Sequence, residues 1–252
     1  MNKFRFLILL AVAMLTGATF TSCSTDDDND YWNYDGQAMP NALVTVKVDG
    51  DSCYFQLDDS TTLRPINIKK PYGDKEVRAL VNYTVVGNAT ANHGQEVRVN
   101  WIDSILTKKP VPSLATAAEN DNAYGHDAVD IVRDWVTVVE DGYLTLRFRT
   151  LWGSVKAHSI NLLVGVNPNN PYEVELRHNT NGDPQLRWGD GLVAFDLNQV
   201  LPDTHGKKVK LTIKWKSTAG DKSVDFDYTS RPSFASQNML RGFVLNRDNV
   251  IR

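Results

Sequence analysis

Apolar and polar residues alternate with a period of two along most of the chain beyond residue 41. Successive side chains of a β-strand point to opposite faces of a sheet, so this alternation predicts strands. Up to residue 106 the alternating runs are Val44–Val48, Tyr54–Leu57, Val77–Val85, Val97–Trp101 and Ile102–Leu106. About five strands in roughly seventy residues suit a small closed barrel.

The alternation resumes after residue 134, and Asx-Gly pairs separate the apolar runs. These runs are Trp135–Val139, Leu144–Phe148, Ile160–Val166, Tyr172–Leu176, Val193–Leu197 and Val209–Trp215. The turn pairs are Asp141-Gly142, Asn181-Gly182 and Asp190-Gly191. Short strands with turns at this spacing predict an antiparallel β-sandwich. No segment has a convincing helical period, although Asn198–Leu201 could form one turn.

Residues 107–124 separate the two sets of strands. Pro110 and Pro112 are followed there by small polar residues, which is typical of a linker. We therefore predict an all-β chain with a β-barrel domain at residues 41–112 and an antiparallel β-sandwich domain at residues 116–252. Each part has apolar faces of its own, so each is expected to bury a separate core.

The N-terminus has the layout of a secretory signal. Lys3 and Arg5 precede the apolar run Phe6–Leu15, which is too short to span a bilayer, and small polar residues then lead to Cys23. A lone cysteine at this boundary resembles the signal of a bacterial lipoprotein. The resemblance implies that residues 1–22 are removed and that Cys23 carries acyl chains. The alternative is ordinary signal cleavage beside an incidental cysteine.

Residues 23–40 are predicted to be the lipidated cysteine and a flexible tether, because they are acidic and lack hydrophobic periodicity. Ser24 followed by Asp26, Asp27 and Asp28 resembles the surface-export signal of Bacteroidota lipoproteins. This resemblance implies an outer-membrane protein that is held by its lipid anchor and faces the cell exterior.

Charge and cysteine content narrow the functional classes. The chain has 27 basic and 30 acidic residues, and the acidic excess lies in the tether. Nucleic-acid binding normally needs a basic footprint, so we exclude a nucleic-acid partner. The only cysteine besides Cys23 is Cys53, so acylation of Cys23 leaves no disulfide and the fold must depend on its core.

Catalytic and metal-binding signatures are missing from the sequence, which has no H-E-x-x-H, C-x-x-C, G-x-x-x-x-G-K-[ST] or G-x-S-x-G motif. We therefore assign no catalytic residue, metal site or cofactor. His126 with Asp127 and Asp130 could bind a divalent metal, but a solvated loop explains them better. Glu173 and Glu175 could act on glycosides, but a solvated strand face explains them better.

Some exposed groups have two interpretations. The lysines of Lys208–Lys216 could approach anionic polysaccharide, although lysines on an edge strand also prevent aggregation, which we favour. Trp152 and Trp188 adjoin glycines and are weak candidates for stacking on a sugar. Ser60 and Ser104 follow aspartates in a pattern resembling the O-glycosylation acceptor of Bacteroidota envelope proteins.

An ordered set of segments along the mature chain resembles the NigD-like lipoprotein family. The segments are Val77–Val86, Val97–Val111, Asp141–Trp152, Pro171–Asn179 and Gly191–Trp215. The resemblance implies an N-terminal barrel of the oligonucleotide/oligosaccharide-binding (OB) type and a C-terminal β-sandwich. It also implies an immunity-like role beside a bacteriocin, and it transfers no functional residue except Cys23.

We therefore expect a noncatalytic, surface-exposed lipoprotein that binds an unidentified glycan or protein. Two alternatives remain: a hydrolase acting on envelope or dietary glycan, and a purely structural component of the envelope.

Lipidation is directly testable. Substituting Cys23→Ala should abolish metabolic acyl labelling and move the protein from the membrane fraction to the soluble fraction, because two or three acyl chains hold a protein firmly in a bilayer. Unchanged partition into the membrane fraction would contradict lipidation at this residue.

Overall fold

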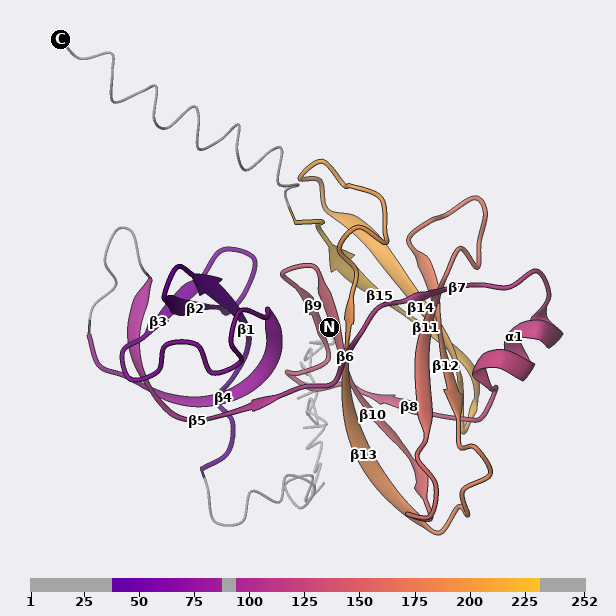
Figure 1. The fold of residues 1–252 in the computed structure, drawn as a ribbon. Helices are drawn as coiled ribbons and strands as arrows, with labels where there is room; N and C mark the ends of the chain where they lie inside the picture. The colour runs from indigo at the N-terminus through magenta and orange to yellow at the C-terminus, as the bar shows by residue number, and fades with distance from the viewer. Residues whose placement is uncertain (1–37, 88–93, 232–252) are drawn as a thin grey trace, which may run out of the picture. The chain divides into compact units, whose positions relative to one another are not determined.

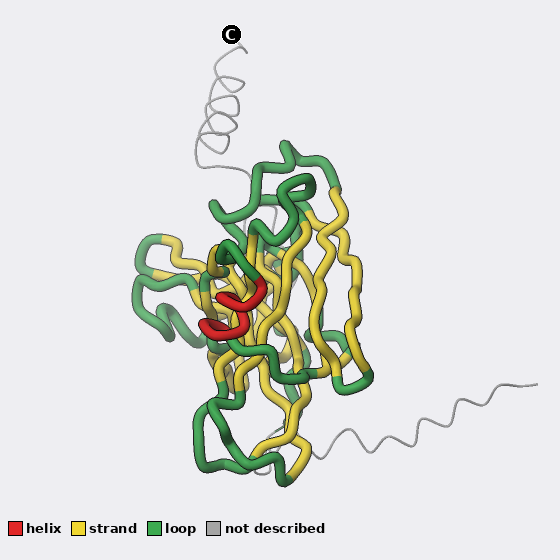
Figure 2. The backbone as a smooth tube through the Cα atoms, turned by 90° about the vertical axis from the view of Figure 1, so that its right-hand side faces the viewer, coloured by secondary structure: helices red, strands yellow, loops and turns green. Residues whose placement is uncertain are grey.

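The computed structural model describes residues 38–87 and 94–231, all within one compact unit (Figure 1). In this part of the chain no helix has the length and apolar character needed to cross a membrane. The predicted lipidation and export residues, Cys23, Ser24, Asp26, Asp27 and Asp28, lie outside the described residues. Strands make up most of what is described, and the single helix there lies beside them (Figure 2).

The first five strands close into a barrel in the order β1-β2-β3-β5-β4. The strands are β1 (Ala42–Asp49), β2 (Ser52–Gln56), β3 (Thr62–Pro65), β4 (Val77–Val85) and β5 (Gln95–Ser104). Their alternate side chains fill the barrel, where Val44, Phe55 and Val81 are completely buried. This closed five-stranded barrel confirms the predicted fold of the N-terminal part.

The identity of the fifth barrel strand differs from the prediction. The alternation predicted two strands between residues 97 and 106, but β5 is one continuous strand. Its pairing with β4 shifts register at Asn82/Tyr83, and such a bulge lets long strands bend around a barrel. The fifth strand is instead β3, a four-residue segment that pairs parallel with β5 and is too short to show alternation.

Two five-stranded sheets form the sandwich. One sheet has the order β6-β13-β10-β8, with β9 also pairing with β10, and the other has the order β15-β14-β12-β11-β7. The strands are β6 (Thr107–Lys108), β7 (Val111–Pro112), β8 (Asp130–Val132), β9 (Val138–Glu140), β10 (Tyr143–Trp152), β11 (Ser159–Val164), β12 (Glu173–Asn179), β13 (Arg187–Asp196), β14 (Val209–Ser217) and β15 (Gly220–Tyr228). Leu146, Leu162, Phe195 and Ile213 are among the fully buried residues of the core between the sheets.

The predicted linker contains regular structure. β6 and β7 add to the two sheets of the sandwich, although residues 107–112 were assigned to the barrel. Helix α1 (Ala117–Tyr124) follows them. A capping box starts the helix, because Thr116 and Glu119 each accept a hydrogen bond from the other's backbone N–H. The helix has no apolar face, so periodicity could not reveal it. Independent folding of the two parts stays a prediction.

The predicted turn at Asp190-Gly191 is wrong, because both residues lie within β13. Asp190 forms ion pairs with Arg147 and Arg149 of the neighbouring β10. A side chain at Gly191 would collide with the Phe148 ring, since its Cβ would lie 2.5 Å from that ring. An Asp-Gly pair usually marks a turn. Here the ion pairs explain the aspartate and the close Phe148 ring explains the glycine, although both residues lie within a strand.

The lysines of β14 do not protect a sheet edge. β14 lies between β12 and β15, so the edge-strand interpretation is wrong. Lys210 of β14 pairs with Asp225 of β15, and Lys208, just before β14, pairs with Asp227. Lys214 pairs with Glu173 of β12 at 2.6 Å. Because these lysines face acidic partners on neighbouring strands, they form cross-strand ion pairs on the outer face of the sheet.

A buried arginine joins the barrel to the sandwich. Arg78 of β4 has no exposed surface, and each of its three side-chain nitrogens donates a hydrogen bond of 3.2 Å. The acceptors are Thr45 in the barrel and Thr145 and Glu140 in the sandwich. A buried guanidinium without partners would be very costly, so this contact fixes β4 against β9 and β10.

Asp141, in the turn between β9 and β10, is a second link. Its backbone is left-handed, with φ of 50°, as the predicted Asp-Gly hairpin turn requires. Its carboxylate accepts hydrogen bonds of 2.7 Å from Lys47 of the barrel and from Arg231 after β15. Arg231 also pairs with Glu76 of the barrel at 2.7 Å. Three parts of the chain therefore meet at one buried carboxylate.

Replacing Asp141→Asn should lower the free energy of unfolding by about 3 kcal/mol, the typical effect of leaving buried cations without their partner. Asparagine tolerates the left-handed backbone, so the turn itself should survive. Urea unfolding measures the change. Asp51→Asn, an exposed residue in the β1–β2 turn, is the matched control and should change stability by less than about 0.5 kcal/mol. If the two variants were equally stable, Asp141 would not be linking the barrel to the sandwich as described.

Candidate functional site

The edge of one sandwich sheet is interrupted, and the interruption forms a cavity. β8 and β9 both pair with β10, at Arg147–Arg149 and at Tyr143–Thr145 respectively. Residues 133–137 therefore leave the sheet between two segments of the same edge. β15, the terminal strand of the other sheet, lies opposite this break.

Local hydrogen bonds explain why the edge strand breaks there. One carboxylate oxygen of Asp134 accepts the backbone N–H groups of Val136 and Thr137 at 3.1 and 3.2 Å. Such Asx turns compete with strand pairing. The Thr137 hydroxyl donates to the carbonyl of Val132 at 2.6 Å. Arg147 of β10 then holds the other oxygen of Asp134 at 2.9 Å, which fixes the turn against the sheet.

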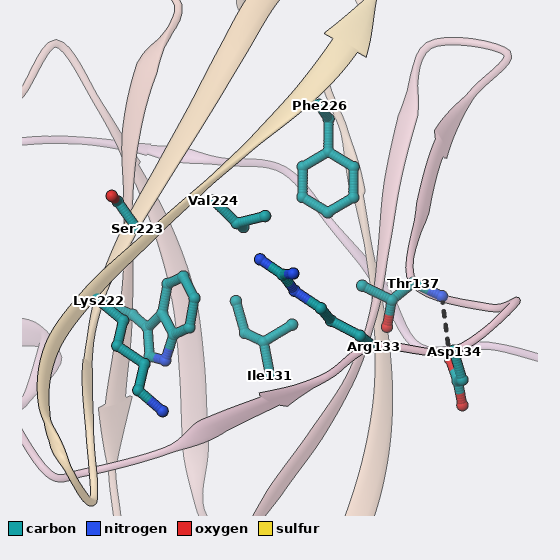
Figure 3. Close-up of a pocket in the computed structure, with 9 residues that line it drawn as sticks. Ile131, Arg133, Asp134, Thr137, Lys222, Ser223, Val224 and Phe226 are labelled. Carbon is teal, nitrogen blue, oxygen red and sulfur yellow. Dashed lines mark hydrogen bonds between the residues drawn. The ribbon is translucent and has the colours of Figure 1, made fainter. Parts of the chain in front are cut away.

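The cavity has a volume of about 560 Å³ and an amphipathic lining (Figure 3). This volume lies within the usual range for small-molecule pockets. Its lining residues are Ile131, Arg133, Asp134, Thr137, Trp215, Lys222, Ser223, Val224 and Phe226. Figure 3 shows the Arg133 side chain extending into the cavity, with its guanidinium among Ile131, Val224 and Phe226.

The positive charges of this cavity are not neutralised by the part of the chain that the structure describes. Arg133 and Lys222 are exposed and form no ion pair with residues 38–87 or 94–231. Lys222 lies directly across from Trp215 in the β14–β15 register. Trp215 is 7% exposed, and its buried indole N–H finds no acceptor among the described residues. A buried donor without an acceptor costs about 1 to 3 kcal/mol.

These groups suit the binding of a ligand that carries an acceptor. A guanidinium and an ammonium attract an anion, and the apolar walls favour burial of an apolar group beside it. Asp134, the one carboxylate in the lining, is already held by Arg147 and by its own turn. The cavity can therefore attract negative charge, and it offers little for acid–base chemistry.

Sequence reasoning did not identify this site. Trp215 was only the last residue of the predicted strand Val209–Trp215, and Arg133 and Lys222 carry no motif. The one feature of the sequence that could have pointed to this cavity was the Asp134-x-x-Thr137 pattern, which is typical of a turn and interrupts an apolar run. Its significance depends on β15 lying opposite, which is a tertiary feature.

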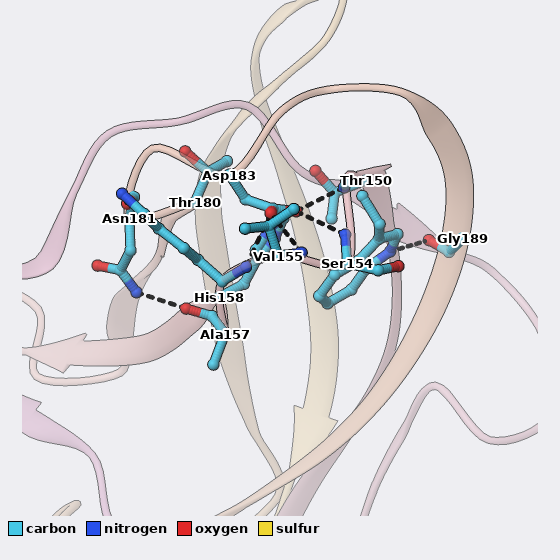
Figure 4. Close-up of polar contacts among 12 residues, drawn as sticks. Thr150, Ser154, Val155, Ala157, His158, Thr180, Asn181, Asp183 and Gly189 are labelled. Carbon is cyan, nitrogen blue, oxygen red and sulfur yellow. Dashed lines mark hydrogen bonds and ion pairs between the residues drawn. The ribbon is translucent and has the colours of Figure 1, made fainter.

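A second polar cluster lies at the other end of β10 (Figure 4). The buried carboxylate of Asp183 accepts four consecutive backbone N–H groups, those of residues 153–156, at 2.5 to 3.1 Å. His158 contacts the same carboxylate at 3.3 Å and contacts His178 at 3.0 Å. Burial, and then the neighbouring His158, lowers the pKa of His178, so its ring is neutral near pH 7.

The two tryptophans predicted to stack on sugars point to opposite faces of their sheet. Trp152 packs against the sandwich core and stacks on the His158 ring, with ring centroids 4.1 Å apart. Trp188 is 45% exposed and lies directly across from Leu151. Leu151 precedes Trp152 on β10, so the side chains of Trp188 and Trp152 point to opposite faces of the sheet. The two rings therefore do not form one platform, and sugar stacking by either stays a prediction.

The remaining candidates are dispersed. Ser60 lies in an exposed turn capped by Asp58, and Ser104 is the exposed last residue of β5. O-glycosylation at either serine stays a prediction. Asp127 bonds to Thr180 and Asp130 bonds to Thr218, so these two carboxylates do not converge with His126 on a common point. Within residues 38–87 and 94–231 the structure has no cluster of metal-ligating side chains.

A larger cavity of about 800 Å³ lies between the barrel and the sandwich. Its lining includes Lys47, Asp141 and Arg231; both cations pair with Asp141, and Arg231 also pairs with Glu76, so neither cation is left without a carboxylate. Neither Trp152 nor Trp188 lines it. We therefore treat the sandwich cavity, with its unpaired cations, as the candidate site.

The Asp183 cluster predicts a specific acid sensitivity. Burial opposes ionisation of Asp183, but the backbone hydrogen bonds outweigh it and hold its pKa well below its ordinary range. Its stabilising contribution is therefore complete above about pH 4 and declines as the pH falls further. Asp183→Asn should lower the urea midpoint at pH 7, and its difference from the wild type should shrink below about pH 4.

Urea unfolding between pH 7 and pH 2.5 measures this difference. Asp221→Asn, an exposed aspartate at the start of β15, is the control and should match the wild type throughout. If the difference in stability between Asp183→Asn and the wild type stayed constant with pH, these hydrogen bonds would not be lowering the pKa of the Asp183 carboxyl group.

Comparison with protein families assigns both parts of the fold. Residues 43–105 match the NigD-like N-terminal OB domain. Residues 111–228 match the NigD-like C-terminal β-sandwich domain, which therefore includes strand β7. A comparison with curated proteins found no match.

Solved structures give the same assignment. A toxin-related protein from Parabacteroides distasonis is 38% identical, with a TM-score of 0.64 over 75% of this chain and 92% of that one. A protein of unknown function from Bacteroides vulgatus is 23% identical, with a TM-score of 0.60 over 77% and 92%. A NigD-like immunity protein from Bacteroides caccae is 20% identical, with a TM-score of 0.53 over 75% and 96%. The chain thus has the barrel and the sandwich in the family's order, and it belongs to the NigD-like family.

Proposed function

We propose that this protein is a surface-exposed outer-membrane lipoprotein that binds a partner without catalysis, in a role of the bacteriocin-immunity type. The observation that carries the proposal is the sandwich cavity, in which Arg133, Lys222 and the indole N–H of Trp215 lack partners among the described residues. Unsatisfied charge and hydrogen-bonding capacity around an apolar cavity favours a ligand that supplies the missing groups.

The sequence supports placement at the cell surface. The signal layout, Cys23 and the acidic residues that follow it are the features of an exported lipoprotein. The structural relatives include one described as an immunity protein and one described as toxin-related, and both descriptions concern those proteins. For this chain they support a protective role at the envelope.

The carboxylates of β12 favour binding over the glycoside-hydrolase alternative. A hydrogen bond from Lys214 lowers the pKa of Glu173, although partial burial acts against it. Glu175 forms an ion pair of 2.8 Å with Arg177. A glycosidase acid needs a raised pKa so that it is protonated near neutral pH. Glu173 is shifted in the opposite direction.

A growth assay tests the protective role. A strain of the source bacterium that lacks the gene is complemented with the wild type or with Cys23→Ala, and each strain is exposed to culture supernatants that inhibit the deletion strain. The wild type should restore growth, whereas the Cys23→Ala variant should not, because its product is released from the membrane. Equal inhibition of the deletion strain and the wild type by every supernatant would contradict the proposal.

A titration separates binding from catalysis. Purified protein is added in steps to a supernatant against which the wild type protects, and residual inhibition is measured after short and long incubation. Binding predicts an end point set by the amount of protein and independent of time. Inhibition that continues to decline at low protein concentration would indicate turnover and would favour the hydrolase alternative.

A further inference from the structure

The two edge strands beside the sandwich cavity add information about its ligand. β15 ends one sheet, and β8 and β9 form the broken edge of the other. The outer side of a terminal strand presents backbone N–H and C=O groups that can pair with another extended chain. The cavity therefore opens between two surfaces that suit an extended peptide.

The charges at the opening indicate which part of a peptide would enter. Arg133 extends into the cavity, and Lys222 lines it from the opposite sheet (Figure 3). Asp225 and Asp227, the neighbouring acids of β15, pair with Lys210 and Lys208 on the outer face. The inner side of β15 therefore keeps its positive charge, which complements a carboxylate.

The walls of the cavity indicate what accompanies the carboxylate. Ile131, Val224 and Phe226 are partly buried, and Trp215 packs behind them in the core. An apolar side chain placed among them would be removed from water, at about 25 cal/mol per Å² of apolar surface. The polar residues Asp134 and Thr137 also line the cavity, so its lining is more polar than an alkyl chain would favour.

We propose that this cavity binds the C-terminus of a peptide that ends in an apolar residue. The terminal carboxylate lies between Arg133 and Lys222, and the last side chain packs among Ile131, Val224 and Phe226. Trp215 lines the same cavity, so its indole lies close to the bound residue. The proposal rests on the noncatalytic binding role given above and names the chemistry of the partner.

Calorimetric titration of the purified full chain tests the proposal with three probes. The first is N-acetyl-Phe-Leu with a free carboxylate, the second is the same dipeptide as its C-terminal amide, and the third is octanoate. The free acid should bind about tenfold more tightly than the amide, a difference of about 1.4 kcal/mol. Added salt should weaken binding of the acid, because exposed charges are screened.

Two exposed variants identify the cations without endangering the fold. Arg133→Met and Lys222→Met should each weaken binding of the acid by about tenfold and leave binding of the amide unchanged. Lys207→Met is the matched control, because Lys207 is also exposed, has no ionic partner among the described residues and lies outside the cavity. It should bind all probes as the wild type does.

The indole region of a ¹H–¹⁵N correlation spectrum gives a second measurement. The Trp215 signal, identified by its loss in Trp215→Phe, should shift when the acid is added. Equal binding of acid and amide, or no binding of either, would overturn the proposal. Octanoate binding as tightly as the peptide would overturn its assignment to a peptide terminus. Because the titration uses purified protein, it can fail while the growth assay succeeds, and the reverse also holds.

Discussion

Two buried arginines impose the constraint on which the rest of the fold depends. A guanidinium removed from water must be surrounded by acceptors, because an unpaired buried charge would outweigh the few kcal/mol by which a domain is stable. Arg78 meets this requirement with Thr45, Thr145 and Glu140, which fixes the barrel against the sandwich. Arg147 meets it with Asp134 and Asp190.

The partners of Arg147 determine where the sandwich is closed and where it is open. Asp190 keeps β13 continuous through a dipeptide that would otherwise turn, and so keeps that side of the sheet regular. Asp134 holds the loop that divides β8 from β9, and so keeps the opposite edge interrupted. The cavity lies at this interruption. A structural ion pair therefore creates the opening, and the cations on its rim are left without partners inside the described fold.

The difference between satisfied and unsatisfied charge is the basis of the functional assignment. Around Asp141, the cations Lys47 and Arg231 are balanced by the carboxylates of Asp141 and Glu76, so the charges beside the larger cavity are paired. Around Arg133 and Lys222 no such compensation occurs within residues 38–87 and 94–231. A protein that binds a partner through complementary charge needs this second arrangement.

The sequence predicted those features that depend on local periodicity. Val77–Val85 and Leu144–Phe148 alternate clearly, so their strands and the all-β fold could be recognised. Helix α1 was missed because a capping box defines it and it has no apolar face. β3 is too short to show a period, and Asp190-Gly191 was mistaken for a turn because its partners are distant in sequence. The candidate site was unpredictable for the same reason, since Arg133 and Lys222 meet only after the two sheets pack.

A crystal structure of the mature chain grown with N-acetyl-Phe-Leu would test the central claim most directly. The account predicts electron density for the peptide in the cavity between β8 and β15, with its terminal carboxylate within hydrogen-bonding distance of Arg133 and Lys222. A cavity that contains only water, or that is filled by the protein's own side chains, under conditions where the peptide is in excess would contradict the account.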